Sequence, residues 1–227
     1  MERIAHRGAK REYPENSLPA FLRAFERHAD AIELDVHATS DSVVVVHHDP
    51  DLRPNPHTPK RRIAEMTWEE LERVELATGV GIPRLSDVLA LTPAEKTVYV
   101  EIKGSDIEAA VVSTIANGSA RCAVHSFDHA AIARCREIAP DLPRGILYDQ
   151  APPDAMVRQL ELVGARDLWP RWNLIDAELV ARVHAAGARV IAWTVNSRAD
   201  AQSLVGLGVD GLCTDDVRLL DAQSQRQ

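Results

Sequence analysis

Strand-like segments alternate with segments of helical periodicity along nearly the whole of this 227-residue sequence. Strand patterns occur at residues 3–6, 31–36, 97–102, 121–125, 144–148, 166–169, 189–194 and 210–213. Such alternation is typical of a parallel sheet whose strands are joined by crossover helices. Eight units in about 220 residues predict an α/β protein with a compact (β/α)8 TIM-type barrel. A doubly wound open sheet is the alternative, but no GxGxxG motif follows the first strand.

A ninth strand pattern, at residues 43–47, follows the strand at 31–36 too closely for a crossover, which needs about 12 residues or more. We therefore expect an antiparallel hairpin. If the turn centres on residues 40 and 41, residues 39 and 42 pair, and the same register places His48 beside Glu33 while His47 points away. This choice of His48 requires a turn of even length, and a bulge would select His47 instead.

Ionisable residues interrupt two apolar strands near their carboxyl ends. Glu33 and Asp35 are two residues apart and share one face of a strand, and Glu101 and Lys103 repeat the pattern in a later strand. The carboxyl ends of barrel strands are the usual place of chemistry. Carboxylates gathered there repel one another unless a divalent cation binds them. Oxygen ligands favour Mg²⁺ or Ca²⁺ over zinc, with Mn²⁺ as a third candidate, so we predict one cation at Glu33, Asp35 and Glu101.

Histidines and cations fall at the same predicted strand ends. His6 ends the first strand and Arg7 follows it, while His48 and Lys103 follow later strands. Two imidazoles, a hard-metal site and two cations suit phosphoryl transfer, because the metal and cations hold the phosphate charge and the histidines move protons.

Composition narrows the class of protein. The net charge of −8 disfavours a nucleic-acid partner, and no apolar run reaches the ~18 residues that a membrane span needs. The charged start, MERIAHRGAK, predicts no signal peptide, and the cysteines (Cys122, Cys135 and Cys213) have no CxxC spacing. We expect a cytoplasmic protein with reduced thiols.

The expected organisation is one barrel domain over residues 1–220 and a frayed tail at 221–227. The irregular region at 49–66 has four prolines between residues 50 and 59. It is either a solvated loop or a flap over the site.

Nine segments occur in the order seen in glycerophosphodiester phosphodiesterases, and the chain resembles that family from Ile4 to about Asp216. These segments are AHRG, PENSLPAF, IELDV, VVVVHHDP, IPRLSDVL, VYVEIKG, HSFD, AWTVN and GVDGLCTD. The resemblance implies a TIM-type barrel that hydrolyses glycerophosphodiesters, its small-molecule substrates, to glycerol 3-phosphate and an alcohol.

The resemblance also implies roles for individual residues. The implied acid/base pair is His6 and His48, and the implied metal ligands are Glu33, Asp35 and Glu101. The implied phosphate contacts are Arg7 and Lys103. Further implied substrate-site residues are Glu15, Asn16 and Trp193, the last of them near the alcohol. The sequence departs from the family pattern at Ser17, His47, Arg84 and Asp87 and in the HTPKRR segment, which leaves substrate choice open.

Three competing interpretations remain. The chain could be a relative in the same superfamily that cleaves lysophospholipids or sphingolipids at phosphate. It could be a lyase that forms a Schiff base at Lys103, although the carboxylates would then have no role. It could also be a phosphate-binding barrel without catalytic activity. The oligomeric state has no signal in the sequence.

Overall fold

The computed structural model describes residues 1–53 and 59–220, and it confirms the predicted barrel. Within these residues, eight parallel strands pair in chain order, and β1 pairs with both β2 and the last strand, which closes the barrel. The strands are β1 (Glu2–His6), β2 (Ala31–Ala38), β8 (Thr97–Ile102), β9 (Arg121–Ser126), β10 (Arg144–Tyr148), β11 (Asp167–Pro170), β12 (Arg189–Ala192) and β13 (Gly211–Thr214).

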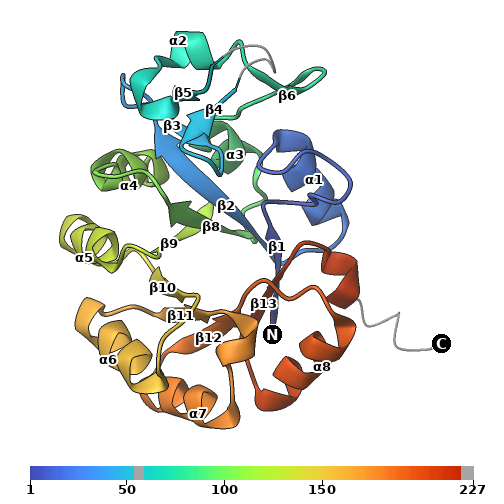
Figure 1. Ribbon diagram of the computed structural model, residues 1–227, viewed down its shortest axis with the longest axis vertical. Helices are drawn as coiled ribbons and strands as arrows, with labels where there is room; N and C mark the ends of the chain where they lie inside the picture. Colours follow the sequence, from blue (N-terminus) through green and yellow to red (C-terminus); the bar gives the residue numbers. More distant parts are fainter. Residues whose placement is uncertain (54–58, 221–227) are drawn as a thin grey trace.

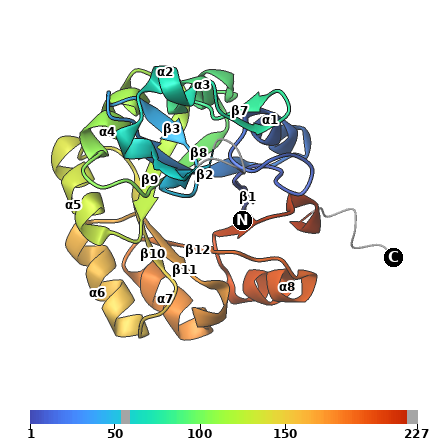
Figure 2. The same cartoon turned by 45° about the horizontal axis from the view of Figure 1, so that its top comes forward.

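Helices surround these strands, as Figure 1 and Figure 2 show. They are α1 (Leu18–Glu26), α3 (Leu85–Leu91), α4 (Glu108–Ala116), α5 (His129–Ile138), α6 (Pro153–Val163), α7 (Ala177–Ala185) and α8 (Arg198–Leu207). Short helical turns are α2 (Trp68–Leu71), η1 (Ile63–Glu65), η2 (Trp172–Leu174) and η3 (Val217–Leu220). Several of these helices are preceded by a residue whose side chain accepts a hydrogen bond from a backbone N–H of the first turn, as the Ser17 side chain does from Ala20. No helix in the described ranges combines the length and apolar character that crossing a membrane demands.

The barrel interior is filled by one apolar layer to which every barrel strand contributes one side chain. The layer consists of Ile4, Ala31, Tyr99, Ala123, Leu147, Trp169, Ile191 and Cys213. Trp169 fits because Gly145 on β10 has no side chain: an added Cβ there would lie 2.9 Å from the indole ring. A second apolar core lies between the strands and the helices. Because this layer closes the interior, a cavity can open only above it, on the side of the carboxyl ends of the strands.

The antiparallel hairpin is confirmed, but its predicted register is wrong by one residue. β3 (Val44–Val46) pairs with β2 so that Val36 lies opposite Val46. The turn has an odd number of residues, because the Thr39 N–H donates to Val43 and Ser42 takes a left-handed φ of 64°. β3 also ends at Val46, two residues before His48. The alternation of side chains between the two faces of a strand, on which the prediction of His48 depends, therefore does not extend to His48.

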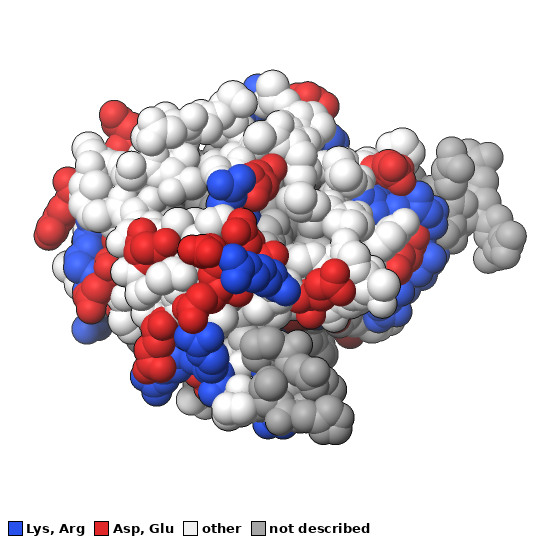
Figure 3. All heavy atoms as spheres, turned by 90° about the horizontal axis from the view of Figure 1, so that it is seen from above, with Lys and Arg blue, Asp and Glu red and all other residues white. Residues whose placement is uncertain are grey.

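The described part of the region predicted as a loop or flap, 49–66, belongs to a longer segment that has a small apolar core and extends to residue 82. β4 (Asp51–Leu52) pairs antiparallel with β5 (Arg61–Arg62), followed by η1, α2 and a hairpin of β6 (Glu75–Ala77) and β7 (Val80–Gly81). This core consists of Val45, Leu52, Ile63, Met66, Leu71, Val74 and Ile82. The segment lies at the top of Figure 1, and on the face seen from above in Figure 3 acidic and basic side chains are interspersed. Residues 54–58 of the predicted flap and the predicted tail, 221–227, lie outside the described residues.

Candidate active site

A cavity of about 140 Å³ opens at the carboxyl ends of the barrel strands. It is lined by His6, Arg7, Glu33, His48, Glu101, Lys103, His125, Phe127, Leu147, Trp169, Trp193 and Cys213. Seven of these are residues that the sequence predicted for the site. The other three predicted residues, Asp35, Glu15 and Asn16, are not among the lining residues.

The β1–α1 connection positions His6 and Arg7. Gly8 follows them with a φ of 80°, and a Cβ there would lie 2.7 Å from a backbone carbon of Ala20. Only glycine lets the chain turn this close to α1, which explains why a glycine ends the AHRG segment. Arg7 itself has a left-handed φ of 58°. Its N–H donates to the backbone oxygen of Glu33 (2.9 Å) and to the Glu33 carboxylate (3.2 Å), so the turn is tied to β2.

Asp35 is fully buried and already has cationic partners. Its carboxylate lies 3.0 Å from Arg7 Nε and 3.4 Å from Lys103 Nζ, and it accepts a hydrogen bond of 2.8 Å from Asn16 Nδ2. Burial acts to raise the pKa of Asp35, but Arg7, Lys103 and the Asn16 hydrogen bond outweigh it and hold the pKa below its usual value. Asp35 is therefore an ionised carboxylate that orients the two predicted phosphate-binding cations.

Glu15 supports the same network from the other side. Its carboxylate contacts Arg7 Nη1 and Lys10 Nζ, each at 2.9 Å. Asn16 has a φ of 57°, and its side chain reaches Asp35 as described above. In this structure both residues hold Arg7 and Asp35 in place.

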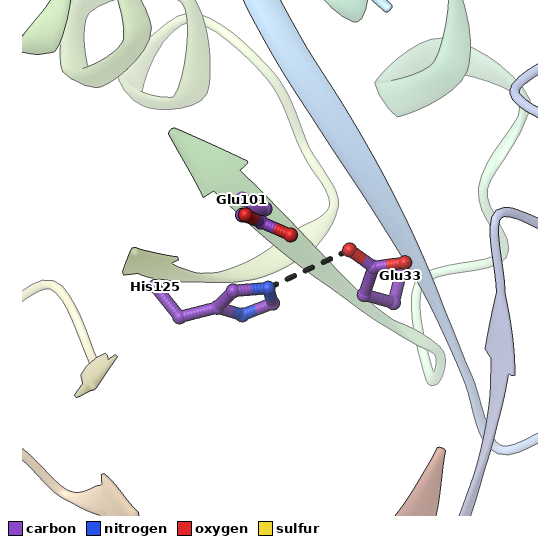
Figure 4. Close-up of side chains that lie close together, drawn as sticks. All are labelled: Glu33, Glu101 and His125. Carbon is purple, nitrogen blue, oxygen red and sulfur yellow. Dashed lines mark ion pairs between the residues drawn. The ribbon is translucent and has the colours of Figure 1, made fainter. Parts of the chain in front are cut away.

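Glu33 on β2, Glu101 on β8 and His125 on β9 form a buried cluster (Figure 4). One ligand atom of each lies within 4.8 Å of the others, and His125 Nε2 is 3.6 Å from Glu33 Oε1. Burial first, and then the charge of Asp35, raises the pKa of Glu33 and of Glu101. A cation bound here would remove this penalty, so the donor set fits a divalent ion.

The two predicted catalytic histidines have carboxylate partners. His6 Nδ1 lies 2.7 Å from Asp215 Oδ1, and Asn196 Nδ2 donates to the other oxygen of Asp215, also at 2.7 Å. Burial acts to raise the pKa of Asp215, but its contacts with His6 outweigh it and lower the pKa well below its usual range. His48 Nδ1 lies 2.8 Å from Asp49 Oδ1. His47 donates its backbone N–H to Asp35 and is not a lining residue, whereas His48 is.

Apolar side chains form the opposite wall of the cavity. Trp193 donates its indole N–H to the backbone oxygen of Trp169 (2.9 Å), and Phe127 packs edge-on against Trp193 at 5.4 Å between ring centroids. Phe127 is 43% exposed, so this wall reaches the surface. The cavity thus has a charged side and an aromatic side.

Two residues of the site, His125 and Asp215, had no predicted role. Both follow from the rule that selected His6, because His125 lies near the end of β9 and Asp215 comes directly after β13. The HSFD and GVDGLCTD segments contribute to the family resemblance, but the sequence alone predicts no function for either residue.

Comparisons with known proteins agree with this fold. A model of the glycerophosphoryl diester phosphodiesterase family matches residues 6–219. A glycerophosphodiester phosphodiesterase of Caldanaerobacter subterraneus is 32% identical over 234 residues, covering 96% of this chain and 95% of that protein. The crystal structure of a glycerophosphodiester phosphodiesterase from Thermotoga maritima superposes with a TM-score of 0.85 at 26% identity, covering 97% and 96% of the two chains. A phosphodiesterase from Oleispira antarctica, solved with its product sn-glycerol-3-phosphate, has a TM-score of 0.89 at 23% identity and coverages of 99% and 97%.

Proposed function

This chain belongs to the glycerophosphoryl diester phosphodiesterase family, and we propose that it hydrolyses glycerophosphodiesters to glycerol 3-phosphate and an alcohol with the aid of a divalent cation. The observation that carries the proposal is the meeting of His6, His48, Arg7 and Lys103 with buried carboxylates in one cavity. The product bound by the Oleispira antarctica relative supports glycerol 3-phosphate as the product here.

The proposed metal site includes Glu33 and Glu101, with Asp35 as the third carboxylate that the sequence predicts. One oxygen of Asp35 is buried without a hydrogen-bond partner among the described residues, although Lys103 lies 3.4 Å away. This oxygen is available for a further contact. A bound divalent cation would neutralise charge on the phosphate and polarise its oxygens.

His6 acts in this proposal as the general base. Asp215 accepts from Nδ1–H in the neutral tautomer that this role requires, in which Nε2 carries no proton; Nε2 lies 3.9 Å from Glu33. Nε2 takes the proton of the attacking water, and Asp215 stabilises the imidazolium that forms. His48 donates a proton to the departing alcohol oxygen, so protons balance over the step.

Arg7 and Lys103 hold the phosphate. Burial acts to lower the pKa of Lys103, but Glu101 and Asp35 outweigh it and raise the pKa above its usual value. Lys103 is therefore an ammonium ion, which suits a phosphate contact. A Schiff-base lyase needs the free amine, so this environment disfavours that alternative.

The aromatic wall receives the alcohol. Trp193 and Phe127 offer contact area without groups that demand a particular head group, so choline, ethanolamine and glycerol should all be accepted as leaving groups. The retained glycerol can satisfy polar groups on the charged side, and a site built for hydroxyl groups rejects substrates that lack them.

The test measures release of glycerol 3-phosphate from glycerophosphocholine, glycerophosphoethanolamine and glycerophosphoglycerol, with and without added Mg²⁺, Mn²⁺ or Ca²⁺. Metal-dependent release from all three supports the proposal. Preference for lysophospholipid or sphingolipid, or release of phosphocholine, would assign the chain to the related lipid enzymes. Absence of turnover on every phosphodiester would indicate a non-catalytic phosphate-binding barrel.

The three cysteines, Cys122, Cys135 and Cys213, are free thiols, which supports the cytoplasm as the proposed compartment.

A further inference from the structure

His48, the proposed general acid, lies beyond the end of the strand that leads to it. β3 ends at Val46, so the ladder of hydrogen bonds with β2 does not extend to His48. Next to it, the His47 N–H donates to the backbone oxygen of Asp35, and the Pro50 oxygen accepts from the first residue of η1. Within the described ranges, the backbone of His48 itself makes no hydrogen bond to another backbone group. Its position therefore depends on side chains.

One buried side chain supplies the missing contact. His37 lies on β2, two residues beyond Asp35 and on the same face of the strand, and it is only 6% exposed. Its Nε2 lies 3.1 Å from the backbone oxygen of His48. A carbonyl oxygen only accepts, so Nε2 carries the hydrogen and donates it. This bond continues the attachment of the chain to β2 after the pairing of β2 with β3 has ended.

The other contact of His48 is weaker. Its Nδ1 lies 2.8 Å from Asp49 Oδ1, but the side chains of His48 and Asp49 are 36% and 61% exposed. An exposed pair of this kind restrains its members little, because solvent competes for both. His37, in contrast, belongs to a strand that pairs with β1 on one side and β8 on the other. The bond from His37 is therefore the firmer attachment of His48 to the barrel.

We propose that His37 is a positioning residue for the general acid, and that its hydrogen bond to the backbone of His48 holds the His48 imidazole where it can protonate the departing alcohol. The inference rests on the proposed function, in which His48 is that acid. His37 is not a lining residue of the cavity, so it acts through His48 and not on the substrate. A displacement of about 1 Å at a catalytic group can cost on the order of 100-fold in rate. Loss of the bond should therefore slow proton donation and leave substrate binding nearly unchanged.

The test compares two substrates that share the glycerol phosphate and differ in the leaving group, namely glycerophosphocholine and the p-nitrophenyl ester of glycerol 3-phosphate. Choline needs a proton as it departs, whereas nitrophenolate is a stable anion that leaves without one. His37→Met removes the donor, and His37→Gln, which has the same length, restores an N–H group. The matched pair thus separates the hydrogen bond from the filling of space.

We expect His37→Met to lower kcat for glycerophosphocholine by about tenfold or more, with a change in KM of less than about threefold. For the nitrophenyl ester, the same variant should lower kcat by less than about threefold. His37→Gln should stay within about threefold of wild type on both substrates. The ratio of the two rates, measured on one preparation, does not depend on how much of a variant is folded.

Two further variants complete the test. His129 Nε2 lies 3.1 Å from the backbone oxygen of Leu147, so His129→Met breaks the same kind of bond beside another lining residue. This control should keep both rates within about twofold of wild type. Adding His37→Met to His48→Ala should cause almost no further loss, because both changes act on one proton transfer.

Equal losses with the two leaving groups would overturn the inference, because a general disturbance of the site does not depend on the alcohol. So would a His37→Gln variant as slow as His37→Met, or losses of His37→Met and His48→Ala that multiply. These outcomes leave the proposed hydrolysis intact, since release of glycerol 3-phosphate by the wild-type chain is measured separately. If the wild-type chain releases none from either substrate, the proposed function itself fails, and the role of His37 fails with it.

Discussion

Replacing Asp215 by asparagine should lower kcat for phosphodiester hydrolysis by about tenfold or more while leaving the barrel folded. Asp215 uses one oxygen to hold His6 Nδ1 and the other to accept from Asn196 Nδ2. Asparagine has one acceptor oxygen for these two sites. When that oxygen faces Asn196, an NH₂ group faces His6, and the imidazole proton must move to Nε2, where a base is required.

The expected loss in kcat follows from the strength of the hydrogen bond between Asp215 and His6. A hydrogen bond to a charged group contributes roughly 1.5–3 kcal/mol, and each 1.36 kcal/mol of barrier is tenfold in rate, so the loss should lie between about 10- and 150-fold. The Asp215 side chain is 22% exposed, and solvent can replace part of the contact, so we expect the lower half of this range. Removing His6 itself should lower the rate more, on the order of 10²–10⁴.

Steady-state kinetics with glycerophosphocholine separates positioning from binding. We expect kcat to fall in Asp215→Asn with less than a threefold change in KM. Combined with His6→Ala, Asp215→Asn should add almost no further loss, because both changes remove the same function.

The chain supplies its own control at the opposite end of β13. Asp210 precedes that strand and lies 2.9 Å from His184 Nε2, so Asp210→Asn breaks a similar carboxylate–imidazole pair far from the cavity. It should lower thermal stability without lowering kcat more than about twofold. If both variants showed the same kinetics, or if the losses of Asp215→Asn and His6→Ala multiplied, a positioning role for Asp215 would be refuted.

Four further outcomes are expected. EDTA should abolish activity and divalent cations should restore it, and Glu33→Gln should be inactive yet folded by circular dichroism; full activity in metal-free enzyme would contradict the metal site. His48→Ala should lower kcat on the order of 10²–10⁴ and His47→Ala much less, and the reverse order would reassign the acid. Burial raises the pKa of Glu33 and of Glu101 to about 7, so the metal-free native state binds more protons than the unfolded state between pH ~4.5 and 7. The free energy of unfolding, measured by urea titration, should therefore fall as pH rises through this window. In Glu33→Gln this dependence on pH should be weaker. Glycerophosphocholine should have a higher kcat/KM than bis(p-nitrophenyl) phosphate, and a preference for the nitrophenyl ester would refute a glycerol-selective pocket on the charged side of the cavity.

The sequence by itself determined the fold class, the strand positions and most of the cavity lining. These depend on local rules, namely the period of two along a strand, the minimum length of a crossover, and chemistry at the carboxyl ends of parallel strands. His6, Glu33 and Glu101 end up in the cavity for that reason. Even the departure of the hairpin register has a local origin, because the left-handed φ of Ser42 gives the turn an odd length that its residue types do not reveal.

Only the tertiary structure decided which partner each charged group has. His6 meets Asp215 across 209 positions of sequence, because barrel closure brings β1 beside β13. Asp35 is equivalent to Glu33 by strand spacing, but the β1–α1 turn delivers Arg7 to Asp35, whereas Glu33 lies in a buried cluster with Glu101 and His125. Strand spacing specifies the direction in which a side chain points, whereas the distance between side chains on different strands depends on how the closed barrel sets their register and twist.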